Sequence, residues 1–196
     1  DDAAWGSMPV PGMWELNGYG DPVYVNIGYA WRGNFRNDPP YVPDAENHVG
    51  SYRRTFDIPA SWGGKDIFLS IGSATSNVYV WVNGRFVGYS EDSKLAAQFD
   101  ITKFVKSGEN LIALQMFRWS DGTYLEDQDF WRFAGIARGV ELTARDKAHL
   151  EDVRITPVLD SEYKDATLRV EVETTPRVKS VGLTLRDAAG GVVAEH

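Results

Sequence analysis

The sequence contains no cysteine and only three histidines, and both shortages narrow the chemistry open to it. Without a thiol the chain forms no disulfide, no thiolate zinc site and no cysteine nucleophile. His48, His149 and His196 form no pair at the i, i+4 spacing of a helical metal site, so zinc is not indicated. The sequence also lacks a Gly-x-Ser-x-Gly elbow and a glycine-rich phosphate loop, which argues against a serine esterase and a nucleotide-binding site.

Basic residues are outnumbered, with 20 Lys and Arg against 28 Asp and Glu, a net charge of −8 and a pI near 4.9. A nucleic-acid partner needs a concentrated basic surface, so none is expected. No apolar run approaches the roughly 18 residues that a membrane span needs, so no membrane partner is expected either. The sequence shows no signal peptide, and Asp1 is not a natural start, so the compartment stays open.

The sequence also lacks the periodicity of an amphipathic helix over any window of about 12 or more residues. Apolar residues instead alternate with polar ones in short runs separated by turn residues, which is typical of strands. Asn83-Gly84 between two such runs predicts a hairpin, because both turn positions need positive φ. Phe99–Val105 reads as a helical turn or short connection. Strands are predicted at Tyr52–Ile58, Ile67–Ile71, Asn77–Val82, Arg85–Tyr89, Leu111–Phe117 and Ile136–Ala144.

Together these runs predict an all-β sandwich whose strands begin near Ser51. Residues 1–48 are predicted to be an irregular arm rich in aromatic residues. A second unit is predicted from Lys147, with strands at Leu150–Leu159, Ala166–Thr175, Ser180–Asp187 and Gly190–Glu195. So few strands leave unpaired edges. Residues 147–196 are therefore expected to be an incomplete domain.

The stretch Arg118–Gly135, RWSDGTYLEDQDFWRFAG, combines carboxylates with aromatic rings. A sugar suits this mixture, because its hydroxyls need acceptors while its C–H face stacks on a ring. The alternative is a solvated loop held down by a few aromatic anchors. The sequence leaves both open at this point.

The acids of this stretch also raise catalytic and metal alternatives. Glu126, Asp127 and Asp129 are candidates for the paired carboxylates of a glycoside hydrolase, but a sequence does not reveal the raised pKa that one member needs. Asp121, Glu91 and Asp129 are hard oxygen donors suited to Mg²⁺, Ca²⁺ or Na⁺. Upstream, Asn26 is either a sugar-binding amide or a turn-capping residue.

Several motifs, in this order, resemble the N-terminal part of a β-galactosidase of glycoside hydrolase family 2, the large lactase type. They are WELNGYGDPVYVN (Trp14–Asn26), PPYVP (Pro39–Pro43), VWVNGRFVGYSEDSKL (Val80–Leu95), FDITKFVKSGEN (Phe99–Asn110) and RWSDGTYLEDQDFWR (Arg118–Arg132). The resemblance covers most of residues 9–145. The stretch 30–38 is longer than the family pattern.

The resemblance implies a jelly-roll-like β-sandwich of the galactose-binding type over residues 1–146, followed by a truncated immunoglobulin-like β-sandwich over residues 147–196. In the family the two catalytic glutamates lie on a downstream (β/α)₈ barrel, so the resemblance implies no catalytic residue in this chain. It implies that the chain alone is inactive, that the barrel is its partner, and that the intact enzyme is a homo-oligomer.

Site roles also follow from the resemblance. Asn26 stands where the family lines the galactose subsite, and Asp129 stands where an aspartate binds galactosyl hydroxyls and an active-site Na⁺. Asp121 and Glu91 resemble positions of a structural Mg²⁺ site. Glu91 departs from the glutamine expected there, and the ligands nearer the N-terminus are not in this chain.

Three functions are therefore weighed. The first is a substrate-positioning domain of a retaining β-galactosidase. The second is a free-standing carbohydrate-binding module, and the third is a structural role in subunit contacts. Related β-glucuronidase and β-mannosidase members of the family are not separated from β-galactosidase, although the LEDQDFW run favours the galactosidase.

Overall fold

A computed structural model describes residues 2–31, 35–126 and 128–196 of the chain. Two predictions fall partly outside these residues: Asp127 as a candidate carboxylate, and the middle of the long stretch 30–38. The chain forms two compact units, Asp1–Ala144 and Arg145–His196. Each is described by itself.

The larger sheet of the first unit is antiparallel and has the strand order β3-β8-β5-β6. Side chains alternate between its faces, so Val78, Val80 and Val82 point into the core while Tyr79 and Trp81 lie on the outer face. The strands are β3 (Val49–Ile58), β5 (Val78–Val82), β6 (Arg85–Ser90) and β8 (Gly108–Phe117).

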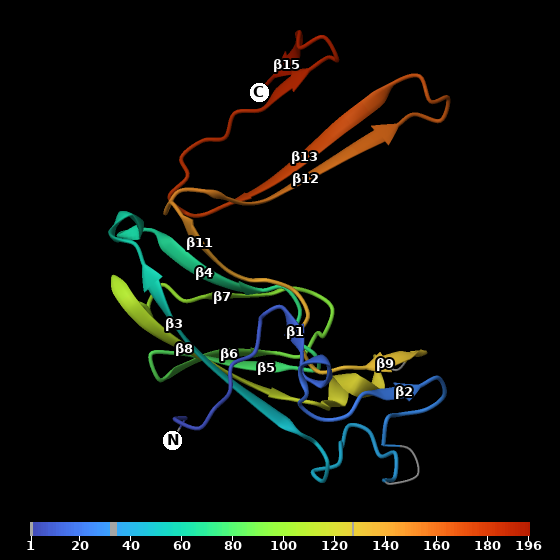
Figure 1. Cartoon of the computed structure of the whole chain (residues 1–196). Coiled ribbons are helices and arrows are strands. Elements are labelled where there is room, and N and C mark those ends of the chain that lie inside the picture. The colour runs from blue at the N-terminus through green and yellow to red at the C-terminus, as the bar shows by residue number, and fades with distance from the viewer. Residues whose placement is uncertain (1, 32–34, 127) are drawn as a thin grey trace. The chain divides into compact units, whose positions relative to one another are not determined.

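A second sheet, of order β11-β4-β7, forms the other layer of the unit, and Figure 1 shows the two layers facing each other. Its strands are β4 (Asp66–Ile71), β7 (Ala97–Asp100) and β11 (Val140–Arg145). The described residues contain no α-helix, only the 3₁₀ turns η1 (Glu15–Asn17), η2 (Ala60–Trp62) and η3 (Asp121–Tyr124). Among them, no helix is long and apolar enough to cross a bilayer. The predicted all-β sandwich is confirmed.

Two short ribbons complete the first unit. One pairs β1 (Gly12–Met13) with β10 (Gly135–Ile136), and the other pairs β2 (Val23–Val25) with β9 (Phe130–Arg132). Both ribbons join the irregular N-terminal arm to the end of the Arg118–Gly135 stretch. Strands this short form no stable hairpin alone, so the sandwich must hold them in place.

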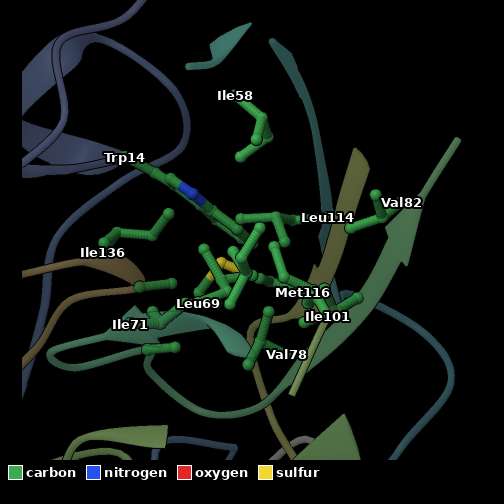
Figure 2. Close-up of a cluster of buried hydrophobic side chains, with 14 residues drawn as sticks. Trp14, Ile58, Leu69, Ile71, Val78, Val82, Ile101, Leu114, Met116 and Ile136 are labelled. Atoms are coloured by element: carbon green, nitrogen blue, oxygen red, sulfur yellow. The ribbon is translucent and has the colours of Figure 1, made fainter. Parts of the chain in front are cut away.

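The core lies between the two layers, where side chains of both sheets converge on the Trp14 indole (Figure 2). Leu69 and Ile71 come from one sheet and Leu114 and Met116 from the other, and all four are buried. Full burial of such a side chain is worth about 1.5–3 kcal/mol, so each of these residues contributes to the stability of the unit.

Gly50 on β3 is required by the packing of Trp14. A Cβ at residue 50 would lie 2.2 Å from Trp14 Cζ2 and 2.7 Å from Cε2. The indole cannot retreat freely, because it is buried and its Nε1 donates a hydrogen bond to the Tyr52 hydroxyl. Because Gly50 has no side chain, the Trp14 ring can pack directly against β3.

We expect Gly50→Ala to lower the free energy of unfolding by about 1–3 kcal/mol, the usual cost of overpacking a core. Urea unfolding followed by tryptophan fluorescence measures this loss. Gly139→Ala is the matched control in the same unit, because its added Cβ meets nothing closer than the Glu141 carboxylate at 3.4 Å. Equal stability of the two variants would show that the indole moves aside without cost.

Most predicted strands of the first unit are confirmed, including the hairpin at Asn83-Gly84, where both residues have positive φ. The interpretation of Phe99–Val105 is wrong in its first part, because Phe99 and Asp100 belong to β7 and pair with Leu69 and Phe68. The single strand predicted at Ile136–Ala144 is divided into β10 and β11.

The second unit contains two antiparallel ribbons. In the longer one, Val153 pairs with Val172 and Ile155 with Val170, so one face is apolar, while Arg154 pairs with Glu171 on the opposite face. The ribbons are β12 (Leu150–Leu159) with β13 (Ala166–Thr174), and β14 (Thr184–Arg186) with β15 (Val192–Glu195). The strand predicted at Ser180–Asp187 is thus shorter than expected.

Candidate functional site

The ribbon of β2 and β9 presents aromatic rings to solvent. Tyr24 pairs directly with Trp131, so both side chains lie on one face, and each is 52% exposed. The Tyr24 and Trp131 ring centroids are 5.5 Å apart, and the Phe133 ring stacks on Trp131 at 5.9 Å. These three rings form a continuous aromatic strip, which we call the ring face.

Asp129 and Asn26 lie together at one end of this ribbon. Asp129 is the residue immediately before β9, and Asn26 is the residue immediately after β2. The ladder ends at the pair Val25 and Phe130, and continuing its register by one step sets Asn26 opposite Asp129. Both residues are exposed. The ribbon therefore brings together two predicted site residues that are far apart in the sequence.

The Asp129 carboxylate is held by a phenol. The Tyr24 hydroxyl donates to Asp129 Oδ1 at 2.5 Å. This hydrogen bond, more than any other influence, raises the pKa of Tyr24 above its ordinary value, because losing the proton would set two negative charges side by side. The sequence reasoning missed Tyr24. The signal was its position two residues before Asn26 in an extended segment, which puts both on one face.

Arg132 fixes the backbone that leads to Asp129. Its guanidinium is buried and donates from Nη1 to the Glu126 carbonyl at 3.2 Å and from Nη2 to the Gln128 carbonyl at 2.6 Å. It also lies over the Phe130 ring, 4.2 Å from the centroid. One buried cation thus ties down the carbonyls on both sides of residue 127.

Glu126 anchors the same loop from its other side. Its carboxylate accepts from the Ser93 backbone N–H at 3.0 Å and from the Ser93 hydroxyl at 2.5 Å, and Ser93 is fully buried. A carboxylate occupied in this way stabilises the loop. The structure therefore gives Glu126 an anchoring role.

A buried ion pair joins the two ends of the Arg118–Gly135 stretch. Arg118 Nη2 lies 3.4 Å from Glu15 Oε1, and the two side chains are only 7% and 1% exposed. Arg118 also donates to the Asp21 carbonyl, while Glu15 accepts from the Ala134 backbone N–H at 3.0 Å. Glu15 had not been singled out from the sequence, where an acid beside a buried tryptophan has no distinctive spacing.

Aromatic contacts anchor the arm that precedes β3. Tyr29 and Trp31 stack at 5.3 Å, and both meet Tyr124 of η3 edge-on at 4.7 and 5.2 Å. The Tyr124 hydroxyl donates to the Tyr41 carbonyl at 2.5 Å and accepts from the Asp38 backbone N–H. These contacts place the described part of the arm beside Tyr124 and hence beside the Arg118–Gly135 stretch.

Glu91 and Asp121 gather around Tyr89. The Tyr89 hydroxyl donates to Glu91 Oε2 at 2.6 Å. Burial and this hydrogen bond, then the negative charges of neighbours that include Asp121, raise the pKa of Tyr89. Both Glu91 and Asp121 carry the carboxylate oxygens that Mg²⁺ prefers as ligands. Among the residues that the structure describes, no group of three His, Cys, Asp or Glu side chains could hold a metal ion.

The ring face is an open surface. A cavity of about 740 Å³ in the same unit is lined by other residues, among them Trp5, Tyr19 and Tyr52. None of Tyr24, Asn26, Asp129 and Trp131 borders it. This part of the described surface thus holds an exposed carboxylate beside exposed aromatic rings.

Comparison with known proteins shows the family to which the chain belongs. Residues 3–146 match the family described as glycosyl hydrolases family 2, sugar binding domain. A beta-galactosidase of Priestia megaterium is 44% identical over 169 residues, which are 86% of this chain and 16% of that protein. One of Lactobacillus delbrueckii subsp. bulgaricus is 41% identical over 197 residues, covering 100% of this chain and 20% of that protein.

Solved structures support the fold. Bacteroides uniformis beta-glucuronidase 2 superposes with a TM-score of 0.72 at 24% identity, over 100% of this chain and 22% of that one. A beta-glucuronidase of an uncultured Clostridium sp. gives a TM-score of 0.64 at 23% identity, over 77% of this chain and 28% of that one. The chain spans at most 20% of the length of the two curated relatives. By the match over residues 3–146, the chain belongs to family 2 of the glycosyl hydrolases and contains the sugar binding domain of that family.

Proposed function

We propose that this chain supplies one wall of the galactose subsite of a retaining β-galactosidase. The observation that carries the proposal is the exposed Asp129 carboxylate, held by Tyr24 at the end of the ring face and set opposite Asn26. The names of the curated relatives, beta-galactosidases at 41–44% identity, favour galactose as the sugar.

The chemistry of this wall suits a neutral sugar. The C–H face of a pyranose stacks on Trp131, while Asp129 and the Asn26 amide receive and donate hydrogen bonds to its hydroxyls. Such bonds strengthen as the ring flattens toward an oxocarbenium ion, so they contribute to binding of the transition state. The nucleophile and the acid–base carboxylate of the double displacement would come from a barrel elsewhere in the polypeptide.

Two cations belong to the same proposal. Asp129 would be a ligand of an active-site Na⁺, with the remaining ligands of the cation outside this chain. Glu91 and Asp121 would contribute to a structural Mg²⁺ site, a role that the family resemblance suggests and that carboxylate oxygens suit. Chelation of Mg²⁺ should therefore lower the stability of the protein at chelator concentrations that leave sugar binding unchanged.

The domain layout is also proposed. Residues 1–146 would be a jelly-roll-like domain, and residues 147–196 the start of an immunoglobulin-like sandwich. The exposed apolar face of the β12–β13 ribbon, with Ile155 62% exposed, favours burial against further strands of the longer protein. The barrel of the same polypeptide and, in a homo-oligomer, a second copy would be its partners.

Catalytic competence of the chain tests the proposal. The 196-residue chain should show no measurable turnover of a chromogenic β-galactoside, because it lacks the catalytic pair, whereas the polypeptide extended through the barrel should hydrolyse it. Parallel assays with a β-glucuronide and a β-mannoside should give far lower kcat/KM for the extended protein. Turnover by the pure 196-residue chain, or a preference for the glucuronide, would contradict the proposal.

The second candidate is a free-standing carbohydrate-binding module, favoured by the exposure of Tyr24 and Trp131. Calorimetric titration with galactose separates the two functions. A single wall should bind galactose too weakly to measure, while a complete module should bind at millimolar or lower concentration. The third hypothesis is a role in subunit contacts. It predicts that conservative substitutions in the Arg118–Gly135 stretch alter the assembly of subunits while the kinetic constants are still unchanged.

A further inference from the structure

We propose that Tyr24 is a positioning residue of the sugar wall, which sets the orientation of the Asp129 carboxylate through the hydrogen bond to Oδ1. This inference rests on the proposed function of Asp129 and goes beyond it, because it assigns a role to a side chain that is not itself required to touch the sugar.

The strand register explains why these two residues meet. Tyr24 is directly opposite Trp131, and Asp129 lies two residues before Trp131 on the same strand side. Diagonal neighbours across an antiparallel ladder are about 7–8 Å apart, which a tyrosine spans and a shorter side chain does not. The Tyr24 hydroxyl accordingly reaches Oδ1 at 2.5 Å.

Further contacts restrain both Tyr24 and Asp129. The Trp131 ring lies 5.5 Å from the Tyr24 ring and limits its movement along the ribbon. Arg132 holds the carbonyl of Gln128, the residue before Asp129. The backbone of Asp129 is thus fixed by one contact and its carboxylate by another, which is how a binding group is prepared for its ligand.

The hydrogen bond also determines which oxygen of the Asp129 carboxylate is available to a ligand. Oδ1 is engaged by the phenol, and Oδ2 has no partner among the residues described. Oδ2 is therefore the oxygen available to a sugar hydroxyl or to the proposed Na⁺. The shift of the Tyr24 pKa is in the direction that keeps the phenol a donor throughout the neutral and mildly alkaline range.

Tyr24→Phe in the full-length enzyme tests this role. It removes the hydroxyl and keeps the ring, so we expect kcat/KM for a chromogenic β-galactoside to fall about tenfold with an unchanged melting temperature. Tyr163→Phe is the matched control, since Tyr163 is 79% exposed in the other unit. Normal kcat/KM for Tyr24→Phe overturns the inference.

A double-mutant cycle distinguishes positioning from a separate contribution. If Tyr24 acts through the carboxylate, Tyr24→Phe should change kcat/KM by less than about twofold in an Asp129→Ala background. A tenfold loss in both backgrounds overturns the inference and leaves the role of Asp129 intact. Near-normal kinetics of Asp129→Ala alone would instead overturn the proposed function together with the inference.

Discussion

Replacing Asp129 by alanine in the full-length protein should lower kcat/KM for a β-galactoside about 100- to 1000-fold. A hydrogen bond to a charged group contributes about 1.5–3 kcal/mol, and two such bonds to sugar hydroxyls, each near the lower end of that range, account for a loss of this size. The melting temperature should change little, because the side chain is exposed and its partner is a surface phenol. Steady-state kinetics and thermal unfolding of the same preparation measure both effects.

Two variants sharpen this test. Asp129→Asn keeps an acceptor and removes the charge, so its kcat/KM should lie between those of the wild type and the alanine variant. Asp44→Ala removes an exposed acid of the same unit outside the ribbon and should leave kinetics unchanged. If Asp129→Ala retained kcat/KM within about twofold of the wild type, the sugar wall would have to lie elsewhere.

Local patterns in the sequence predicted the sandwich well. The alternation within Tyr52–Ile58 correctly predicted a strand, and Asn83-Gly84 correctly predicted a hairpin. Such features depend on residues close in the chain, where side-chain period and turn conformation act directly. The interpretation of Phe99 and Asp100 failed because pairing with β4, a tertiary contact, overrides a weak local preference.

The arrangement of the site could not be predicted in the same way. Asn26 and Asp129 were named from a family resemblance, but the β2–β9 ribbon that sets them opposite each other joins distant segments. Strands as short as Val23–Val25 give too few residues for a period to be recognised. The contacts that support the site, from Arg132 to carbonyl groups and from Glu126 to Ser93, leave no spacing signal in the sequence.

Replacing Glu15 by alanine should cost about 3–5 kcal/mol of unfolding free energy, the loss expected when one member of a buried ion pair is removed. Arg118 would stay buried with its charge uncompensated. Its Nε already has no partner among the residues described, and Nη2 would keep only the Asp21 carbonyl. Chemical denaturation of the 196-residue chain measures the loss. Asp2→Ala, which breaks the exposed pair with Arg53, should cost less than about 1 kcal/mol.

The effect of Glu15 on the sugar wall should be indirect. Its carboxylate binds Arg118 at the start of the loop and the Ala134 N–H at its end, so it joins the two ends of the segment that carries Asp129. Glu15→Gln keeps an acceptor for Ala134 and removes the charge, and should cost about 1–3 kcal/mol. Well below their lowered melting temperatures, both full-length variants should retain nearly normal kcat/KM, because the folded loop presents Asp129 unchanged. A stable Glu15→Ala protein with impaired kinetics would mean that the ion pair sets the geometry of the site directly.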